Sequence, residues 1–392
     1  MGRSKLIVNY IPEICAFIHG RKRPSVVSVN LTDKCNQKCI YCEIGQGYRS
    51  IDKRRLTSDD LFWIIDQMEM MGLKRLSMCG GEPFLFPDIL DVVYYAYTKK
   101  IKSNITSNGM TIHMLNAEQF DLLSRCGTHI NISIDSFDNE IQSLTRGSKI
   151  ALKNAIKSVE ELSKKRIPFT LLSTISKYNC HDLFDSFVTA YKLGIKEVLY
   201  QPVITYSNYP GLPAITQKHL INAEKDQISM LTNQLEKIYQ FEKRHAIKSN
   251  IYRLKPWIAK YIESSVNGTN ERFFKNVLER FYCRESLAVI DISYQGGIQP
   301  CGLAEAEINI KDNRDTDLFS QWLKAGSDLR KDLKNQDYPE MCNGCCHKFS
   351  RNMLASVMRY PVANRKVLYT LSVLLMARML IGLSKLIKAG RA

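Results

Sequence analysis

Neither end of this 392-residue chain has the pattern of a membrane span or of a signal peptide. The apolar run at 367–377 is broken by Arg378, whereas a spanning helix needs about 20 apolar residues. The first 20 residues carry Pro12 and Glu13 within their apolar part and lack a small-residue cleavage site. We therefore expect a cytoplasmic protein whose twelve cysteines are reduced thiols rather than disulfides.

Acidic residues are scarce in the two tails, although the composition is otherwise that of a folded globular protein. The net charge is +16, and residues 365–391 contain six basic residues and no acid. Basic residues interleaved with apolar ones suit an anionic membrane surface better than a polynucleotide, which favours basic residues along the body of the protein. We expect peripheral membrane contact through an amphipathic helix in 351–392, and a helix packed on the body or a dimer contact is the alternative.

The first cysteine group, Cys35, Cys39 and Cys42, lacks a fourth cysteine at close spacing. It follows the β-rich run at 25–29, so its thiols are predicted on a loop that leaves a strand. Three thiolates can hold three corners of a 4Fe-4S cluster and leave one iron open for chemistry. The alternative is a structural zinc loop, for which His19 and Cys79 are the candidate fourth ligands.

Strand-like and helix-like segments alternate from residue 25 to residue 201. The strand-like ranges are 26–31, 75–78, 102–106, 129–135, 169–174 and 197–201, and an amphipathic segment lies between each pair. Such repeats predict parallel strands with right-handed crossovers. Because six repeats are fewer than the eight of a closed barrel, the predicted fold is α/β, a partial (β/α)6 TIM-like barrel with its site at the carboxyl ends of the strands.

Polar and glycine-rich segments stand at those predicted strand ends. Gly80, Gly81 and Glu82 follow the second strand, Asn108 follows the third, and Ser133 and Asp135 end the fourth. Glycines without a Cβ would let the backbone approach a bound amino acid, and a glutamate could hold its ammonium group. These segments are expected to meet at one edge of the sheet, beside the first cysteine group.

The CxxxCxxC spacing with Tyr41 before its last cysteine resembles the radical S-adenosylmethionine (radical SAM) superfamily over about residues 25–201. The resemblance implies a partial barrel, a 4Fe-4S cluster, S-adenosylmethionine that is cleaved to a 5′-deoxyadenosyl radical, and a reductant such as flavodoxin or ferredoxin. It also implies that Tyr41 lies near adenine, that Ser133 and Asp135 meet the ribose or methionyl group, and that Arg146 pairs with the carboxylate. A solvated position at a helix start is the alternative for Arg146.

A second cysteine group comprises Cys283, Cys301, Cys342 and Cys345, with Cys346 as a competing fourth ligand. A predicted hairpin at 287–300 separates its first two members. The pattern resembles the twitch extension, a shorter relative of the SPASM extension, which implies one auxiliary 4Fe-4S cluster. A structural zinc site is the alternative, since four thiolates suit either metal.

These features predict five regions: a basic apolar segment at 1–24, the barrel at 25–215, a helical bridge at 216–282, a small cysteine-rich auxiliary-cluster domain at 283–350 and a basic amphipathic helical tail at 351–392. The predicted function is hydrogen abstraction from a substrate C–H bond. The substrate is expected to be a lipid or lipid-linked sugar at the membrane surface. A ribosomally made peptide is the alternative substrate, and a non-catalytic electron carrier is the alternative function.

Overall fold

The computed structural model describes residues 24–47, 53–203, 219, 225–255, 257–266, 283, 285–342 and 345. Both basic tails, Cys346, and the predicted helical bridge at 216–282 before residue 225 (apart from His219) and after residue 266 lie outside these residues. Within the described part of the chain, no helix is long and apolar enough to cross a membrane.

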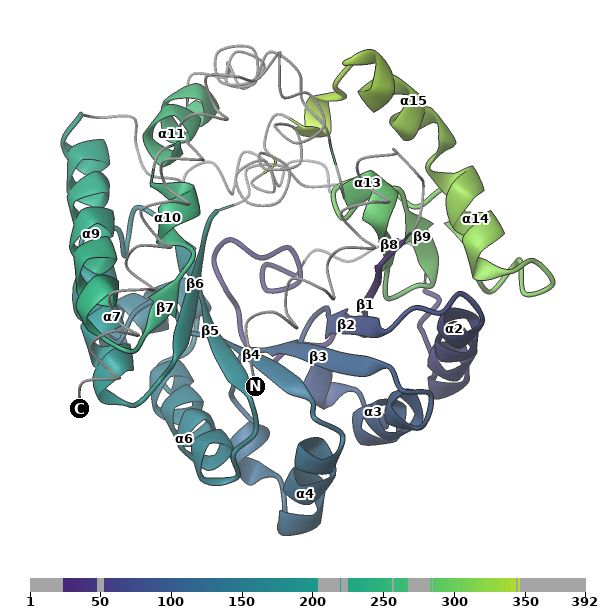
Figure 1. Cartoon of the computed structure of the whole chain (residues 1–392), viewed down its shortest axis with the longest axis horizontal. Coiled ribbons are helices and arrows are strands. Elements are labelled where there is room, and N and C mark those ends of the chain that lie inside the picture. Colours follow the sequence, from purple (N-terminus) through teal and green to yellow (C-terminus); the bar gives the residue numbers. More distant parts are fainter. Residues whose placement is uncertain are drawn as a thin grey trace, which may run out of the picture.

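A single twisted sheet of ten strands curls into an open barrel with helices around its outside (Figure 1). The strand order is β10-β9-β8-β1-β2-β3-β4-β5-β6-β7. The bounds are β1 (Val26–Asn30), β2 (Arg75–Cys79), β3 (Lys102–Ser107), β4 (His129–Ser133), β5 (Phe169–Ile175), β6 (Glu197–Pro202), β7 (Lys248–Ser249), β8 (Val289–Ile292), β9 (Gly297–Gln299) and β10 (Ile308–Asn309). The predicted partial barrel is confirmed.

Helices connect the parallel strands and cover the outer face of the sheet (Figure 1). They are α2 (Ser58–Met70), α3 (Ile89–Thr98), α4 (Ala117–Arg125), α5 (Asn139–Arg146), α6 (Ala151–Lys164), α7 (Leu183–Lys192), α9 (Lys225–Arg244), α10 (Ile251–Leu254), α11 (Ile258–Val266), α13 (Glu285–Ala288), α14 (Leu318–Ala325) and α15 (Ser327–Asn335). Three 3₁₀ turns, η1 (Pro83–Leu85), η2 (Ile112–Met114) and η3 (Glu340–Cys342), complete the described elements.

The core lies between the sheet and this helical layer, as α2 illustrates. The helix starts at Thr57, whose hydroxyl accepts from the backbone N–H of Asp60 in a capping box. Its apolar face then buries Leu61 and Ile64 against alternate residues of the strands. Because side chains alternate along a strand, the residues between these buried positions point into the barrel.

The later hairpin extends the barrel sheet itself. Strands β8 and β9 pair antiparallel, which confirms the predicted hairpin. Strand β8 also pairs in parallel with β1, and the indole of Trp322 on α14 donates to the carbonyl of Val289 at 2.9 Å. With the short strand β7 beside β6, eight parallel strands therefore stand side by side, two more than the six predicted repeats.

Candidate metal centre and cofactor site

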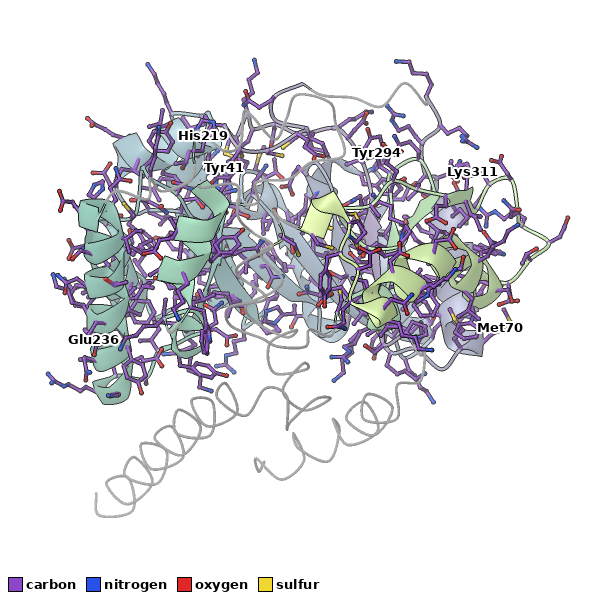
Figure 2. The ribbon with its side chains drawn as sticks, turned by 90° about the horizontal axis from the view of Figure 1, so that it is seen from above. Tyr41, Met70, His219, Glu236, Tyr294 and Lys311 are labelled. Atoms are coloured by element: carbon purple, nitrogen blue, oxygen red, sulfur yellow. The ribbon has the colours of Figure 1, made fainter. Side chains whose placement is uncertain are left out.

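The first cysteine loop lies against the carboxyl ends of β1 and β2. The backbone N–H of Leu31 donates to the carbonyl of Cys79 at 2.8 Å, and that of Gly81 donates to the carbonyl of Thr32 at 2.6 Å. Tyr41 of this loop lies at the same side of the molecule as His219, opposite Met70, which ends α2 (Figure 2). The loop therefore sits at the edge where the sequence predicted a site.

Glycines let this loop approach the neighbouring segments closely. A Cβ on Gly81 would lie 2.0 Å from the carbonyl oxygen of Lys34, and Gly80 has a φ of +124° with its Cβ position 2.8 Å from the carbonyl oxygen of Thr32. The two glycines thus let the backbone of the cysteine loop pack directly against the segment that follows β2. Gly147, which the sequence analysis did not single out, also allows close approach of the cysteine loop. Its Cβ position lies 2.2 Å from the carbonyl oxygen of Lys38.

The three thiols of the first group influence one another electrostatically. Burial is the main cause that raises the pKa of each thiol, to about 11 for Cys39, and the neighbouring thiols raise it further. The guanidinium of Arg146 opposes this effect at Cys39. A bound metal would favour the thiolate forms, because ligation requires deprotonated sulfur.

Asp135 and Arg146 form a buried ion pair beside this loop. A terminal guanidinium nitrogen of Arg146 donates to Oδ1 of Asp135 at 2.6 Å, the backbone N–H of Thr174 donates to the same carboxylate at 2.9 Å, and the hydroxyl of Tyr41 donates to its other oxygen. Burial alone would lower the pKa of Arg146, but Asp135 holds it well above its ordinary value. Arg146 ends α5 and is only 8% exposed, so the alternative of a solvated helix-start position is wrong.

Glu82 and Asn108 tie the strand ends to the cysteine loop. The buried carboxylate of Glu82 accepts from the hydroxyl of Ser107 at 2.7 Å and from the backbone N–H groups of Asn108 and Phe84. The amide of Asn108 donates to Asn36 within the loop at 2.7 Å and approaches the sulfur of Cys35 at 3.8 Å. Burial raises the pKa of Glu82, which these hydrogen bonds partly offset.

Ser133 ends β4 with its side chain half-buried, on the strand face that points into the barrel. Its carbonyl lies 3.5 Å from the amide nitrogen of Gln142, which anchors α5 beneath the strand end. The predicted cofactor residues therefore come together around the cysteine loop, although their roles stay predictions.

The site fits an anionic group that accepts hydrogen bonds. Within the described part of the chain, two buried donors beside Cys39 have no acceptor: Nε of Arg146 and Nε2 of Gln37, whose residue is 3% exposed. An unsatisfied buried donor is costly, so a cluster with its bound ligand would supply what these donors lack. In the same described residues no three His, Cys, Asp or Glu side chains converge on a single ion.

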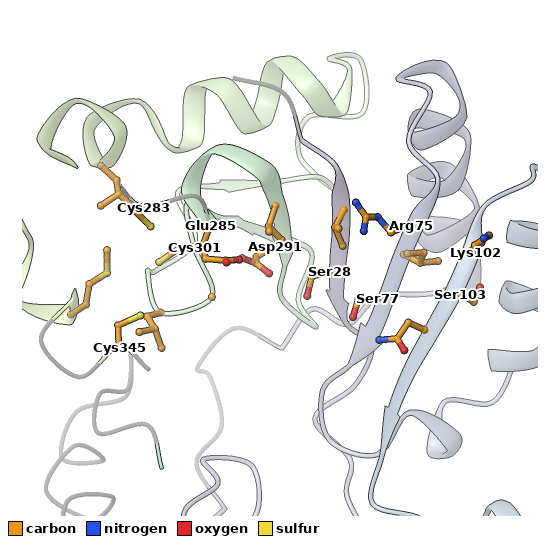
Figure 3. Close-up of a pocket in the computed structure, with 18 of the residues that line it drawn as sticks. Ser28, Arg75, Ser77, Lys102, Ser103, Cys283, Glu285, Asp291, Cys301 and Cys345 are labelled. Carbon is orange, nitrogen blue, oxygen red and sulfur yellow. The ribbon is translucent and has the colours of Figure 1, made fainter. Parts of the chain in front are cut away.

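The second cysteine group opens into a cavity of about 540 Å³ on the inner side of the sheet. Cys283, Cys301, Cys342 and Cys345 line this cavity (Figure 3). Burial, followed by the neighbouring thiols, raises the pKa of Cys283 to about 12 and that of Cys301 well above its ordinary value. The four predicted ligands are therefore near one another, although the auxiliary cluster itself stays a prediction.

Comparison with known proteins gives the class. Residues 29–188 match the family model of the Radical SAM superfamily. This part of the chain is a radical SAM domain, a domain that uses a 4Fe-4S cluster and S-adenosylmethionine, and the sequence relatives of the chain are enzymes.

Two enzymes illustrate the sequence relatives. The AdoMet-dependent heme synthase of Methanosarcina barkeri is 28% identical over 44% of this chain, and the match spans about half of the relative, 48% of its length. The GTP 3′,8-cyclase of Clostridium botulinum (strain Hall) is 25% identical over 75% of this chain and 85% of its own. These identities do not carry a substrate over to this chain.

Solved structures share the fold. Streptococcus suis SuiB bound to S-adenosylmethionine aligns with a TM-score of 0.60 and 16% identity, over 88% of this chain and 78% of SuiB. The enzyme anSMEcpe with bound AdoMet and the Cp18Cys peptide aligns with a TM-score of 0.57 and 13% identity, over 89% of this chain and 99% of its own. At such low identity the likeness shows the fold alone.

Proposed function

We propose that Cys35, Cys39 and Cys42 bind the 4Fe-4S cluster and that this enzyme abstracts hydrogen from a C–H bond of its substrate. When bound, the cluster supplies the electron that splits a carbon–sulfur bond of S-adenosylmethionine. The observation that carries the proposal is the group of three coupled thiols at the carboxyl edge of the barrel, next to two buried donors that lack acceptors.

The surrounding residues bind and orient S-adenosylmethionine in this proposal. Tyr41 packs near the adenine, held by its hydrogen bond to Asp135. Glu82 receives the ammonium group, because a carboxylate has about four acceptor positions and protein donors occupy three. Arg146 attracts the methionyl carboxylate, while Gly80, Gly81 and Asn108 hold the cysteine loop in place and Ser133 faces the ribose or methionyl group.

Replacement of single cysteines tests the cluster assignment. Each of Cys35→Ala, Cys39→Ala and Cys42→Ala is expected to reduce the release of 5′-deoxyadenosine, with dithionite as reductant, to background. Cys126→Ala is the matched control, since Cys126 caps α4 away from this group. Reconstituted wild-type protein that holds iron yet releases no 5′-deoxyadenosine would indicate a non-catalytic electron carrier instead. Iron content should be about eight atoms per chain if both cysteine groups hold cubanes.

The proposed substrate is a lipid or lipid-linked sugar at the membrane surface. Its support is the basic, apolar sequence of the tails, which lie outside the described residues. The full chain is expected to float with anionic liposomes, and a chain without residues 365–392 is expected to float less. Equal flotation of the two proteins, or none by either, would contradict this proposal.

A peptide is the alternative substrate, because one structure of the same fold is SuiB bound to its precursor peptide SuiA. Transfer of deuterium from labelled candidates into 5′-deoxyadenosine distinguishes the two classes. Transfer from a labelled peptide, and none from a lipid-linked sugar, would favour the alternative. Either reaction needs an electron donor, for which we propose flavodoxin or ferredoxin.

A further inference from the structure

A row of polar side chains crosses five adjacent strands on the inner face of the barrel. Strand register places Asp291 of β8 beside Ser28 of β1, Ser28 beside Ser77 of β2, Ser77 beside Asn104 of β3, and Asn104 beside His129 of β4. All five residues line the 540 Å³ cavity. We call these five residues the polar row.

The polar row is unusual for the inside of a barrel. Bulky branched side chains normally fill the interior of a (β/α) barrel and leave no room for a ligand. Here the inward positions of β1 to β4, apart from Val26, carry small or hydrogen-bonding side chains, while the apolar residues Val27 and Ile105 face the helices. The interior therefore has both free volume and polar groups.

Two cations lie one layer below the polar row, at the starts of the strands. Arg75 and Lys102 are register partners on β2 and β3, and both line the same cavity. Figure 3 shows Arg75 and Lys102 on the far side of Ser28 and Ser77 from the second cysteine group. The cavity wall thus has a basic end and a hydrogen-bonding middle.

We propose that this cavity binds a phosphorylated sugar, with its phosphate at Arg75 and Lys102 and its hydroxyl groups along the polar row. Arginine and lysine are the side chains that bind phosphate most readily. Hydroxyl, amide, imidazole and carboxyl groups in one row can both donate to and accept from sugar hydroxyls. This inference rests on the proposed function, because it names the substrate class of the same barrel.

The position of the polar row suits a radical reaction at the strand ends. Cys79, at the carboxyl end of β2, lies two positions beyond Ser77, which is about 6.6 Å along a strand. Arg75 lies the same distance below Ser77. A phosphate held at Arg75 would therefore lie about 13 Å along the strand from Cys79, with the polar row between them.

Binding to the cluster-loaded full-length enzyme tests the proposal by calorimetry with three probes: glucose 1-phosphate, free glucose and inorganic phosphate. We expect glucose 1-phosphate to bind at least about tenfold more tightly than either fragment, because the cavity holds both parts. Lys102→Met and Asn104→Leu should each weaken its binding about tenfold, since each removes one proposed hydrogen-bonding partner of the phosphosugar. Lys74→Met is the matched control, an exposed lysine beside Arg75 that does not line the cavity.

A polyprenyl-phosphate-linked glucose in detergent is the fourth probe. Tighter binding of this probe than of glucose 1-phosphate would indicate a lipid-linked substrate, and binding that is no tighter would indicate a soluble one. Equal affinity for glucose and glucose 1-phosphate, no binding of either phosphosugar, or unchanged binding by Lys102→Met would each overturn the proposal. Release of 5′-deoxyadenosine is measured on the same preparation. A preparation that binds glucose 1-phosphate but releases no 5′-deoxyadenosine would contradict the proposed function. A preparation that releases 5′-deoxyadenosine but does not bind glucose 1-phosphate would contradict only this inference.

Discussion

The two cysteine groups lie in opposite electrostatic surroundings. Beside the first group, the buried carboxylate of Asp135 has a cation, Arg146, at 2.6 Å. Beside the second, Asp291 accepts from Ser28 and from the backbone N–H of Gly302, and its neighbouring charge is another carboxylate, Glu285. The carboxylate beside the first group is therefore paired with a cation, whereas the carboxyl group beside the second has another carboxylate as its neighbouring charge.

This difference indicates different tasks for the two groups. Donors and a cation stabilise an anionic cluster and attract the carboxylate of a bound ligand, which suits an open iron. Carboxyl groups disfavour added negative charge, so an auxiliary cluster at Cys283 and Cys301 would be harder to reduce. Three predictions test this comparison, from the largest expected effect to the smallest.

Arg146→Leu should be the most damaging substitution. It removes the cation from a buried pair and leaves the charge of Asp135 without it, which costs about 3–5 kcal/mol of unfolding free energy. Urea unfolding of the reconstituted enzyme measures the loss, and Arg146→Lys should recover part of it. Arg125→Leu is the matched control, because Arg125 also ends a helix but is exposed. Similar losses for Arg146→Leu and Arg125→Leu would show that the pair contributes little.

Asp291 should make stability depend on pH. Burial, and then Glu285, raise the pKa of Asp291 from 3.8 to about 7. The folded protein therefore holds this proton more tightly than the unfolded chain, so the stability is complete below pH 4 and is lost as the pH rises through 7. At about 1.4 kcal/mol per pKa unit, the loss is on the order of 4 kcal/mol.

The variant Asp291→Asn should remove this dependence and be more stable than the wild type at pH 8. Urea unfolding of both proteins at pH 5 and pH 8 provides the measurement. Asp121→Asn, an exposed carboxyl on α4, is the control and should leave the pH dependence unchanged. A wild-type protein that is equally stable at both values would contradict the buried surroundings beside Glu285 described for Asp291.

Local sequence patterns were enough to predict the barrel and the first cysteine loop. The alternation of strand-like and helix-like segments predicted the strands of the barrel. The polar residues at the strand ends predicted the edge of the sheet at which Glu82, Asn108 and Asp135 meet. The pairing of β8 with β1 was not predictable in this way, because it joins segments more than 250 residues apart. Sequence alone also missed α5, so Arg146 was placed at a helix start rather than at a buried helix end.

The packing role of Gly81 could not be predicted from the sequence for a similar reason. A glycine pair after a strand suggests room for a ligand, but the atom that excludes a Cβ at Gly81 is the carbonyl oxygen of Lys34, 47 residues earlier in the chain. Such a contact depends on tertiary packing. Residues whose partners are distant in sequence are therefore the part of the site that needed a structure.

The smallest predicted effect concerns Gln37, which lies between the first two cysteines of the loop. The thiol of Cys39 donates to Oε1 of Gln37 at 3.6 Å, while Nε2 has no acceptor within the described residues. A Cys39 thiolate that binds iron has no proton to donate, so a half-turn of the amide would bring the unpaired Nε2 donor to the sulfur. Hydrogen bonds to sulfur stabilise the more negative, reduced form of a cluster.

Gln37→Leu should therefore shift the midpoint potential of the first cluster to a more negative value, and Gln37→Glu should shift it further because it adds negative charge. A redox titration followed by electron paramagnetic resonance measures the shift in samples of equal iron content. Gln46→Leu is the matched control, since Gln46 donates to the backbone carbonyl of Cys39 at 2.9 Å and not to its sulfur. If Gln46→Leu and Gln37→Leu shift the potential equally, the cause is distortion of the loop rather than loss of a hydrogen bond to sulfur. The donors beside Cys39 would then not account for a difference between the two cysteine groups.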